Sequence, residues 1–195
     1  MKIFGIDPGS DRTGYGCLQT DGSRHRLISS GAIVSSTLPT FPEKLRRIHS
    51  GLTALLREHR PDCVAIENVF HGVNARSALK LGHARGVAML AAVEAGVPIF
   101  EYTPAQIKRA VVGNGRAEKH QIQLMVKILL KLASVPTPHD AADALAVAIC
   151  HSMMPADIDA HYAVQRQAMT SWRQFRPSSA ARSVAPAGFS TRRTK

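Results

Sequence analysis

The sequence has few cysteines and no long run of apolar residues. Its three cysteines lie far apart among 195 residues, each within an apolar segment: Cys17, Cys63 and Cys150. This spacing excludes a disulfide framework and a metal-binding knuckle, and it predicts free, buried thiols in a protein of the reducing cytoplasm. No apolar run approaches the roughly 20 residues that a membrane-spanning helix needs. Asp7 interrupts the first apolar run so early that we expect no secretory signal.

Acidic residues are scarce relative to basic ones. The chain has 25 Lys and Arg residues against 14 Asp and Glu residues, which gives a formal net charge of +11 and a pI near 10.2. A positive charge of this size indicates a polyanionic partner, either nucleic acid or an acidic membrane surface. Charge alone does not distinguish these partners, because ribosomal and architectural proteins share it.

Turn signals and apolar runs predict that three strands come first. Residues 2–7 form an apolar run that ends in an acid, and residues 15–19 and 27–34 also have strand character. Two clusters of turn-forming residues, 8–11 and 20–23, separate these runs. We therefore expect a three-stranded antiparallel meander.

Strands and helices alternate in the part of the chain that follows. The run 63–67 is apolar without a break and ends in Glu67, which is typical of a buried, parallel strand. Another strand is expected at 97–102. Helical periodicity predicts helices at 42–57, at 76–95, from 104, at 119–132 and at 139–153. This order favours an α/β fold, with a mixed central sheet that carries helices on both faces.

The composition changes near residue 155. From Tyr162 to Lys195 there are seven Lys and Arg residues and no acidic residue, and no apolar periodicity persists. We therefore expect one folded domain over residues 1–155 and a disordered basic tail over residues 156–195.

Four carboxylates are placed where such a fold would bring them together. Asp7 and Glu67 end apolar strands, and the last side chains of neighbouring strands lie close together beyond the sheet. Asp140 and Asp143 are three residues apart on a predicted helix, so they share one face. That helix is otherwise small and apolar, and packing it on the sheet would carry both acids inward. Taken singly, Asp7 could be an ordinary turn acid and Asp140 an acid favoured by the helix dipole.

A cluster of four acids in a basic protein predicts a divalent metal site. Mg²⁺ prefers carboxylate oxygen and leaves coordination positions open to phosphate oxygens. Two such ions can activate water and stabilise the leaving oxygen of a phosphodiester. The residues therefore favour a metal-dependent nuclease. An ATP-binding protein of the actin and sugar-kinase kind is an alternative, since its first strand also leads into an Asp-x-Gly turn.

Five blocks of the sequence resemble one family, in the right order and spacing, from residue 1 to about 153. They are similar to the RuvC crossover junction endodeoxyribonucleases and read FGIDPGSDRTGYG (4–16), AIENVF (65–70), NARSALKLGHARGVAMLAA (74–92), VVGNGRAEKHQIQLMV (111–126) and HDAADALAVAICH (139–151). The resemblance implies a ribonuclease H-like fold, a homodimer and symmetrical, Mg²⁺-dependent nicking of two strands at a four-way DNA junction. It also implies two ions per site, with Mn²⁺ as a substitute, and the branch-migration complex RuvA–RuvB as a partner. A non-catalytic junction-binding protein on the same fold is the alternative.

The same resemblance assigns metal binding and catalysis to four residues, Asp7, Glu67, Asp140 and Asp143. His139 is an alternative ligand, because some relatives use a histidine at one position of the last helix. Its other interpretation is a residue that simply begins that helix.

DNA contacts are also implied by the resemblance. Phe70 is expected to stack on an unpaired base at the junction centre, with a core position as the alternative. Lys108 and Lys119 flank a glycine loop and are expected to contact the scissile phosphate, unless they belong to a solvated helix face. The basic tail is expected to add non-specific affinity for DNA. Phosphate contacts from the exposed side of helix 76–95 are expected for Arg76, Lys80 and Arg85.

Helix 76–95 has little polar surface for a helix on the outside of a domain. Ala78, Gly82 and Gly86 form a line of small residues at four-residue spacing, which allows the close approach of another element. Packing on the sheet is one explanation of this line, and the resemblance favours a dimer interface as the other.

Overall fold

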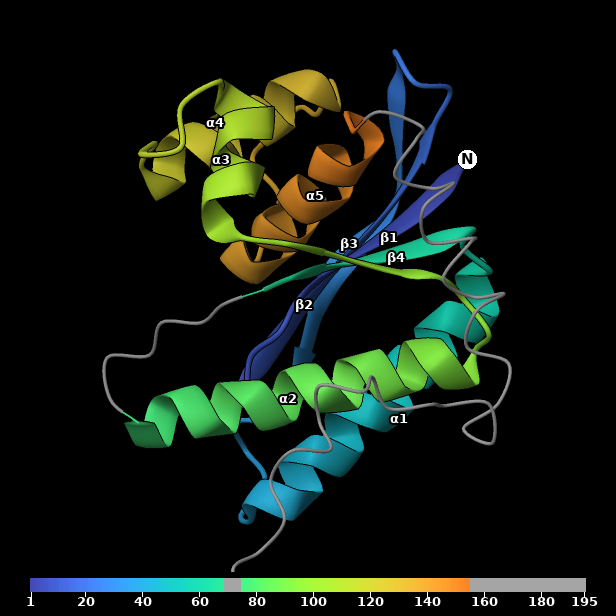
Figure 1. Ribbon diagram of the computed structural model, residues 1–195, viewed down its shortest axis with the longest axis vertical. Coiled ribbons are helices and arrows are strands. Elements are labelled where there is room, and N and C mark those ends of the chain that lie inside the picture. Colours follow the sequence, from blue (N-terminus) through green and yellow to red (C-terminus); the bar gives the residue numbers. More distant parts are fainter. Residues whose placement is uncertain (69–74, 155–195) are drawn as a thin grey trace, which may run out of the picture. The chain divides into compact units, whose positions relative to one another are not determined.

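Five strands, paired in the order β3-β2-β1-β4-β5, form one mixed sheet (Figure 1). β2 pairs antiparallel with both β1 and β3, so the predicted meander is confirmed. β4 runs parallel to β1 and β5 runs parallel to β4, as the unbroken apolar run of β4 predicts. The computed structural model describes residues 1–68 and 75–154, and its strands are β1 (Lys2–Asp7), β2 (Arg12–Thr20), β3 (His25–Val34), β4 (Cys63–Glu67) and β5 (Ile99–Tyr102).

Helices cover both faces of this sheet, which confirms the predicted α/β architecture. α1 and α2 pack against each other below one face in Figure 1, while α5 lies on the other face with α3 and α4 packed against it. The helices of the described ranges are α1 (Phe41–His59), α2 (Ala75–Glu94), α3 (Pro104–Val112), α4 (Lys119–Leu129) and α5 (His139–Ser152).

Two boundaries differ from the sequence prediction, and both differences come from how a helix ends. The strand expected from residue 97 begins at Ile99, because the amide of Val97 still donates to the carbonyl of Ala92 in α2. The helix expected to reach residue 132 ends at Leu129, and Lys131 beyond it adopts a left-handed φ of 55°.

Local signals fix where α1 and α3 begin. Thr40 caps α1 in a reciprocal arrangement with Glu43, and Thr103 caps α3 in the same way with Gln106. A proline in the first turn of each helix costs no hydrogen bond, because its missing N–H would have had no partner there. These caps hold the starts of both helices at fixed points of the chain.

The contact between α5 and the sheet is unusually close, because glycines line the facing strands. A Cβ atom added to Gly5 of β1 would lie 2.0 Å from the carbonyl oxygen of Ala144. One added to Gly14 of β2 would lie 2.0 Å from the carbonyl oxygen of Asp140. The facing residues of α5 are mostly alanines, so the helix backbone rests almost directly on β1 and β2. This packing carries the start of α5 to the ends of the strands.

The opposite face of the sheet buries the main hydrophobic cluster. Phe4 and Ile6 of β1 and Val64 and Ile66 of β4 point to this face, together with the buried side of α1. The strand residues between them therefore point to α5, because side chains alternate along a strand. Val87 and Met89 of α2 are partly buried against this cluster, and the buried residues that α2 contributes to it are alanines: Ala84, Ala88, Ala91 and Ala92.

The cysteine prediction is confirmed, since Cys17, Cys63 and Cys150 are all buried and none of them forms a disulfide. Burial raises the pKa of Cys17 to about 11 and that of Cys150 to about 12, so both remain protonated at neutral pH. Among the helices of the described residues, none is both long enough and apolar enough to cross a membrane. Phe70 and the basic segment 156–195 lie outside the described residues, so the expectations for them, including the domain boundary near 155, stay predictions.

Replacing Gly5 with alanine is expected to destabilise the protein by about 3 kcal/mol, because the new methyl group would overlap the α5 backbone. Urea denaturation measures the change. Gly115→Ala is the matched control: an added Cβ there comes no closer than 3.5 Å to a neighbouring atom, so this substitution should change stability by less than about 1 kcal/mol. Equal effects of the two substitutions would show that α5 does not depend on the glycine surface.

Candidate metal and nucleic-acid site

Two acids of the site come from neighbouring parallel strands. Asp7 is the last residue of β1 and Glu67 is the last residue of β4, one step beyond the paired residues Ile6 and Ile66. By the alternation along each strand, both acids lie on the face that α5 covers. Their carboxyl groups lie within hydrogen-bond distance of each other.

The other two acids, Asp140 and Asp143, lie in the first turns of α5. Burial raises the pKa of Asp7 well above its ordinary value, and the negative charges of Glu67, Asp143 and Asp140 raise it further. Burial is also the largest cause of the raised pKa of Glu67, and the charge of Asp143 adds to it. The structure therefore brings all four acids within electrostatic range of one another at one end of the sheet.

Basic side chains reach these acids from two directions. Lys119, at the start of α4, lies 2.6 Å from Asp143, measured from Nζ to Oδ2. Burial opposes the charge of Lys119, but the hydrogen bond to Asp143 and the negative charges around it outweigh burial and raise the pKa of the lysine. Lys108 of α3 is near enough for its charge to act against the upward shift in the pKa of Glu67.

Arg12 is the basic residue that sequence reasoning missed. It begins β2, and its Nη1 lies 3.9 Å from Oδ2 of Asp140. The available signal was its position directly after the turn that follows Asp7, but arginines at strand ends are common and point to no particular chemistry.

His139 begins α5 and faces a neighbour outside the acid cluster. Its Nδ1 forms a 3.0 Å hydrogen bond with the side-chain amide of Gln123, a residue of α4 that is almost fully buried. The charge of Asp140, by contrast, adds to burial in raising the pKa of Asp7. Gln123 was not singled out from the sequence, although a glutamine beside Ile122 and Val126 on the buried side of a helix was a usable signal.

The donor set suits a hard divalent cation in chemistry and in charge. All four groups are carboxylates, and a bound cation would relieve the repulsion that raises the pKa of Asp7. Within residues 1–68 and 75–154, however, no three His, Cys, Asp or Glu side chains are close enough to surround one ion. Asp143 is turned toward Lys119 and Asp140 toward Arg12, so metal binding requires these side chains to exchange partners.

The remaining predicted phosphate contacts lie on α2. Arg76 is exposed near the start of the helix, and Lys80 lies over the ring of Phe41 with its Nζ 5.9 Å from the ring centre. Arg85 is less exposed than its position along α2 predicts, because its guanidinium is partly buried and pairs with Glu101 of β5, and its phosphate contact stays a prediction. Position along the helix could not reveal this partner, which belongs to the next strand.

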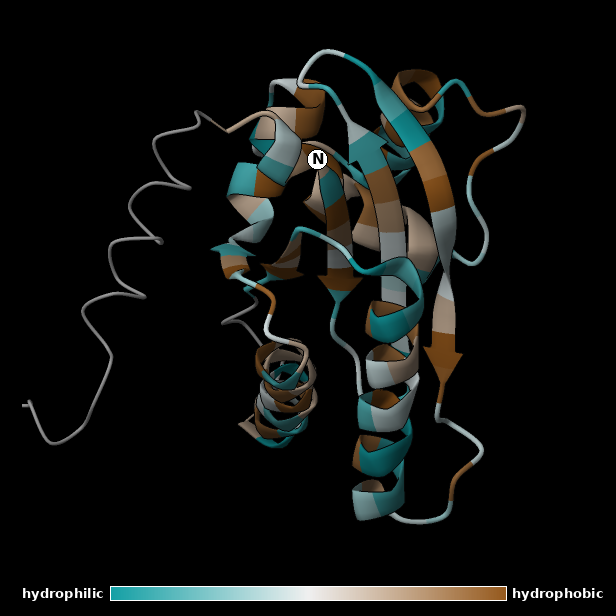
Figure 2. Ribbon diagram, turned by 90° about the vertical axis from the view of Figure 1, so that its right-hand side faces the viewer, coloured by the Kyte–Doolittle hydropathy of each residue, from teal (hydrophilic) through white to brown (hydrophobic). Residues whose placement is uncertain are grey.

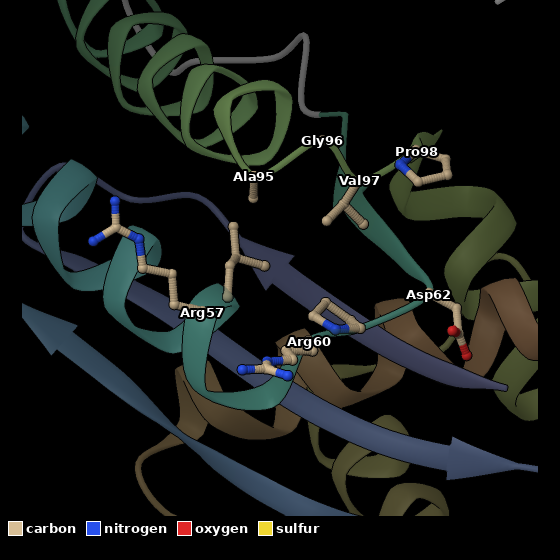
Figure 3. A pocket seen from close by; sticks show the side chains of 9 residues that line it. Arg57, Arg60, Asp62, Ala95, Gly96, Val97 and Pro98 are labelled. Atoms are coloured by element: carbon tan, nitrogen blue, oxygen red, sulfur yellow. The ribbon is translucent and has the colours of Figure 1, made fainter.

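A hollow of about 580 Å³ lies at the other end of the sheet. It lies between the turn from α1 to β4 and the turn from α2 to β5, and Arg57, Arg60 and Asp62 are among its lining residues (Figure 3). Asp62 is its single acid, in contrast to the four acids at the ends of β1 and β4. This hollow is therefore no competitor for the metal site.

Comparison with known proteins agrees with this fold. A relative named crossover junction endodeoxyribonuclease RuvC, from Geotalea uraniireducens (strain Rf4), is 53% identical over 152 residues, which cover 78% of this chain and 88% of the relative. Another of the same name, from Pelobacter propionicus (strain DSM 2379 / NBRC 103807 / OttBd1), is 49% identical over 183 residues and covers 91% of this chain and 100% of the relative.

Solved structures of RuvC also match this chain. Thermus thermophilus RuvC in complex with a Holliday junction substrate matches with a TM-score of 0.75 and 38% identity, over 78% of this chain and 93% of that one. This match confirms the ribonuclease H-like fold. The family described as crossover junction endodeoxyribonuclease RuvC matches residues 3–151. With that match and with relatives about half identical, the chain belongs to the RuvC family of crossover junction endodeoxyribonucleases.

Proposed function

We propose that this chain is an endonuclease that resolves four-way DNA junctions by nicking two strands symmetrically. The observation that carries the proposal is the gathering of four carboxylates at the ends of β1 and β4, in a member of the RuvC family. The net charge of +11 suits a DNA substrate. A four-way junction is the substrate bound to the similar Thermus thermophilus protein.

Asp7, Glu67, Asp140 and Asp143 hold the metal in this proposal, with Mg²⁺ as the ion, two per site, and Mn²⁺ as a substitute. Their all-oxygen donor set and the raised pKa of Asp7 support it. The bound ions would supply an activated water and stabilise the leaving oxygen of the phosphodiester. His139 remains the alternative ligand, and its hydrogen bond to Gln123 favours Asp140 instead.

The chain's own residues prepare the site for a phosphate. Because burial and the charges of the neighbouring acids raise the pKa of Asp7, a metal ion has to compete with a proton for that carboxyl group, and metal affinity should fall as pH falls. Lys119, freed from Asp143, and Lys108 then present positive charge to the scissile phosphate. Arg76 and Lys80 on α2 and the basic segment 156–195 bind more distant phosphates, and Phe70 stacks on an unpaired base at the junction centre.

A homodimer through α2 would place one site on each of two strands. Figure 2, which looks nearly along α2, shows hydrophobic residues spread around the helix. Leu79, Leu90 and Val93 are at least half exposed, and a Cβ added to Gly82 or Gly86 would meet nothing within 4 Å. The predicted close approach at these glycines is therefore not used by the sheet and remains open to a second copy. The dimer would act in the cytoplasm, together with the branch-migration complex RuvA–RuvB.

Asp7→Asn is expected to lower the rate of junction nicking in Mg²⁺ by on the order of 10²-fold or more, because it removes a metal ligand from the strand pair. The measurement is single-turnover cleavage of a labelled four-way junction. Glu58→Gln, which neutralises an exposed acid of α1, is the control and should cut at the normal rate. Junction binding by the unsubstituted protein without any nicks in Mg²⁺ or Mn²⁺ would favour the non-catalytic alternative.

Without divalent ions, Asp7→Asn is also expected to be the more stable protein at neutral pH. The raised pKa means that the folded state keeps a proton that the unfolded state loses above about pH 4, so folding stability falls as pH rises from there toward the folded-state pKa. Asparagine removes this loss, and each kcal/mol should raise the melting temperature by roughly 2–4 °C.

Thermal melting from pH 4 to pH 8 measures the difference, and Mg²⁺ titration extends it. Mg²⁺ should raise the melting temperature of the unsubstituted protein and should raise that of the variant less. If the melting temperatures of the two proteins changed in the same way with pH and with Mg²⁺, Asp7 would not be the metal ligand with the raised pKa.

Leu90→Asp is expected to convert the dimer to a monomer at micromolar concentration, because it places a charge in an apolar interface. Sedimentation velocity measures the mass. Ile128→Asp, at an equally exposed apolar position on α4, is the control and should leave the dimer intact. A monomer already present before any substitution would rule out this interface.

A further inference from the structure

We propose that Arg12 is a substrate-binding residue, whose guanidinium holds a backbone phosphate of the cleaved strand beside the metal site. This inference rests on the proposed nuclease function and adds a residue that the family resemblance did not supply.

Arg12 is directed to the site by the sheet. It shares a strand face with Gly14 and Gly16, the two glycines of β2 that lie against α5. Because α5 meets β2 so closely at Gly14, the neighbouring Asp140 is brought beside the Arg12 side chain. The arginine therefore approaches the acids from the sheet, whereas Lys119 approaches them from the helical layer.

The backbone that carries Arg12 is firmly held. A Cβ added to Gly9 would lie 2.1 Å from the carbonyl oxygen of Arg12, so the turn packs against it without a gap. The hydroxyl of Thr13 donates to the carbonyl of Gly9 over 2.8 Å, and the amide of Ser35 donates to the carbonyl of Asp11 over 2.9 Å. Thr13 and Ser35 are both fully buried. The backbone of Arg12 is thus held in place, while its guanidinium group can still move.

The head of Arg12 is free to bind a ligand. Its side chain is 51% exposed, and the 3.9 Å separation from Asp140 is too long for a hydrogen bond. Among the described residues, no acceptor lies within hydrogen-bond distance of the guanidinium. An exposed, loose ion pair of this kind contributes little to folding stability, so stability does not explain the arginine.

The charges around Arg12 indicate which ligand its guanidinium binds. A cation beside Asp140 opposes the binding of a metal ion there, which makes Arg12 a cost to the metal site unless it also binds the substrate. Once metal occupies Asp140, the arginine loses its anion, and a DNA phosphate is the anion that reaches this position. The planar guanidinium fork matches two phosphate oxygens, which a lysine ammonium does not.

The test compares full-length Arg12→Ala and Arg12→Lys with a matched control, Arg26→Ala. Arg26 contacts Gln19 toward the far end of the same strand pair and should contribute nothing to cleavage. Binding of a four-way junction is measured against salt concentration, in Ca²⁺ and in EDTA, together with the nicking rate in Mg²⁺. Thermal melting establishes that each variant is folded.

Arg12→Ala is expected to weaken junction binding in Ca²⁺ by roughly tenfold or more and to reduce the salt slope by about 0.9, the contribution of one phosphate contact. Arg12→Lys should keep the slope but lose affinity, because the charge remains and the fork does not. The loss of junction affinity in Arg12→Ala should be smaller in EDTA, because without a metal ion the negative charge of Asp140 still lies beside the arginine.

Two results would overturn the inference. One is an unchanged affinity and salt slope in Arg12→Ala. The other is tighter Mg²⁺ binding, seen in thermal melting, with no loss of junction affinity, which would show that Arg12 only offsets the negative charge of the acids. Failure of the unsubstituted protein to bind or nick a junction would instead overturn the proposed function itself.

Discussion

The direct contact between the α5 backbone and the glycine surface of β1 and β2 is the constraint on which the rest of the structure depends. Gly5 and Gly14 leave no room for a side chain between helix and sheet. α5 therefore forms the buried centre of one helical layer, and it also contains Asp140 and Asp143 of the candidate site. Stability and function share this single interface, because any change that lifts the helix also moves Asp140 and Asp143 away from the strand ends.

The site is a compromise between that packing and electrostatics. Bringing Asp140 and Asp143 to the ends of β1 and β4 places like charges together, and the basic side chains of Lys119 and Arg12 lie beside them. In the proposed function, a bound metal ion would take over this charge compensation. Lys119 and Arg12 would then be available to a phosphate, so the same side chains would serve charge compensation and substrate binding.

Sequence patterns predicted the elements and the four acids because both depend on local order along the chain. Apolar runs such as 63–67 have one stable position in a sheet, and an acid that ends such a run must lie at the strand end. Arg85 and Gln123 depend instead on partners from distant elements, Glu101 and His139, which no periodicity reveals. The glycines that receive α5 were equally hidden, because a strand glycine does not indicate which element approaches it.

The parallel pairing of β1 with β4 has a consequence for how accurately the site is built. Asp7 and Glu67 meet because Ile3 to Ile6 are paired in step with Cys63 to Ile66. A slip of one residue would carry Glu67 about 3.3 Å along its strand and turn it to the opposite side of the sheet. Val64 and Ile66 would turn toward α5 in the same movement, where the helix backbone packs closely on small residues such as Gly5. The two acids are thus aligned by the packing of Val64 and Ile66 in the hydrophobic cluster on the opposite face, which holds the two strands in register.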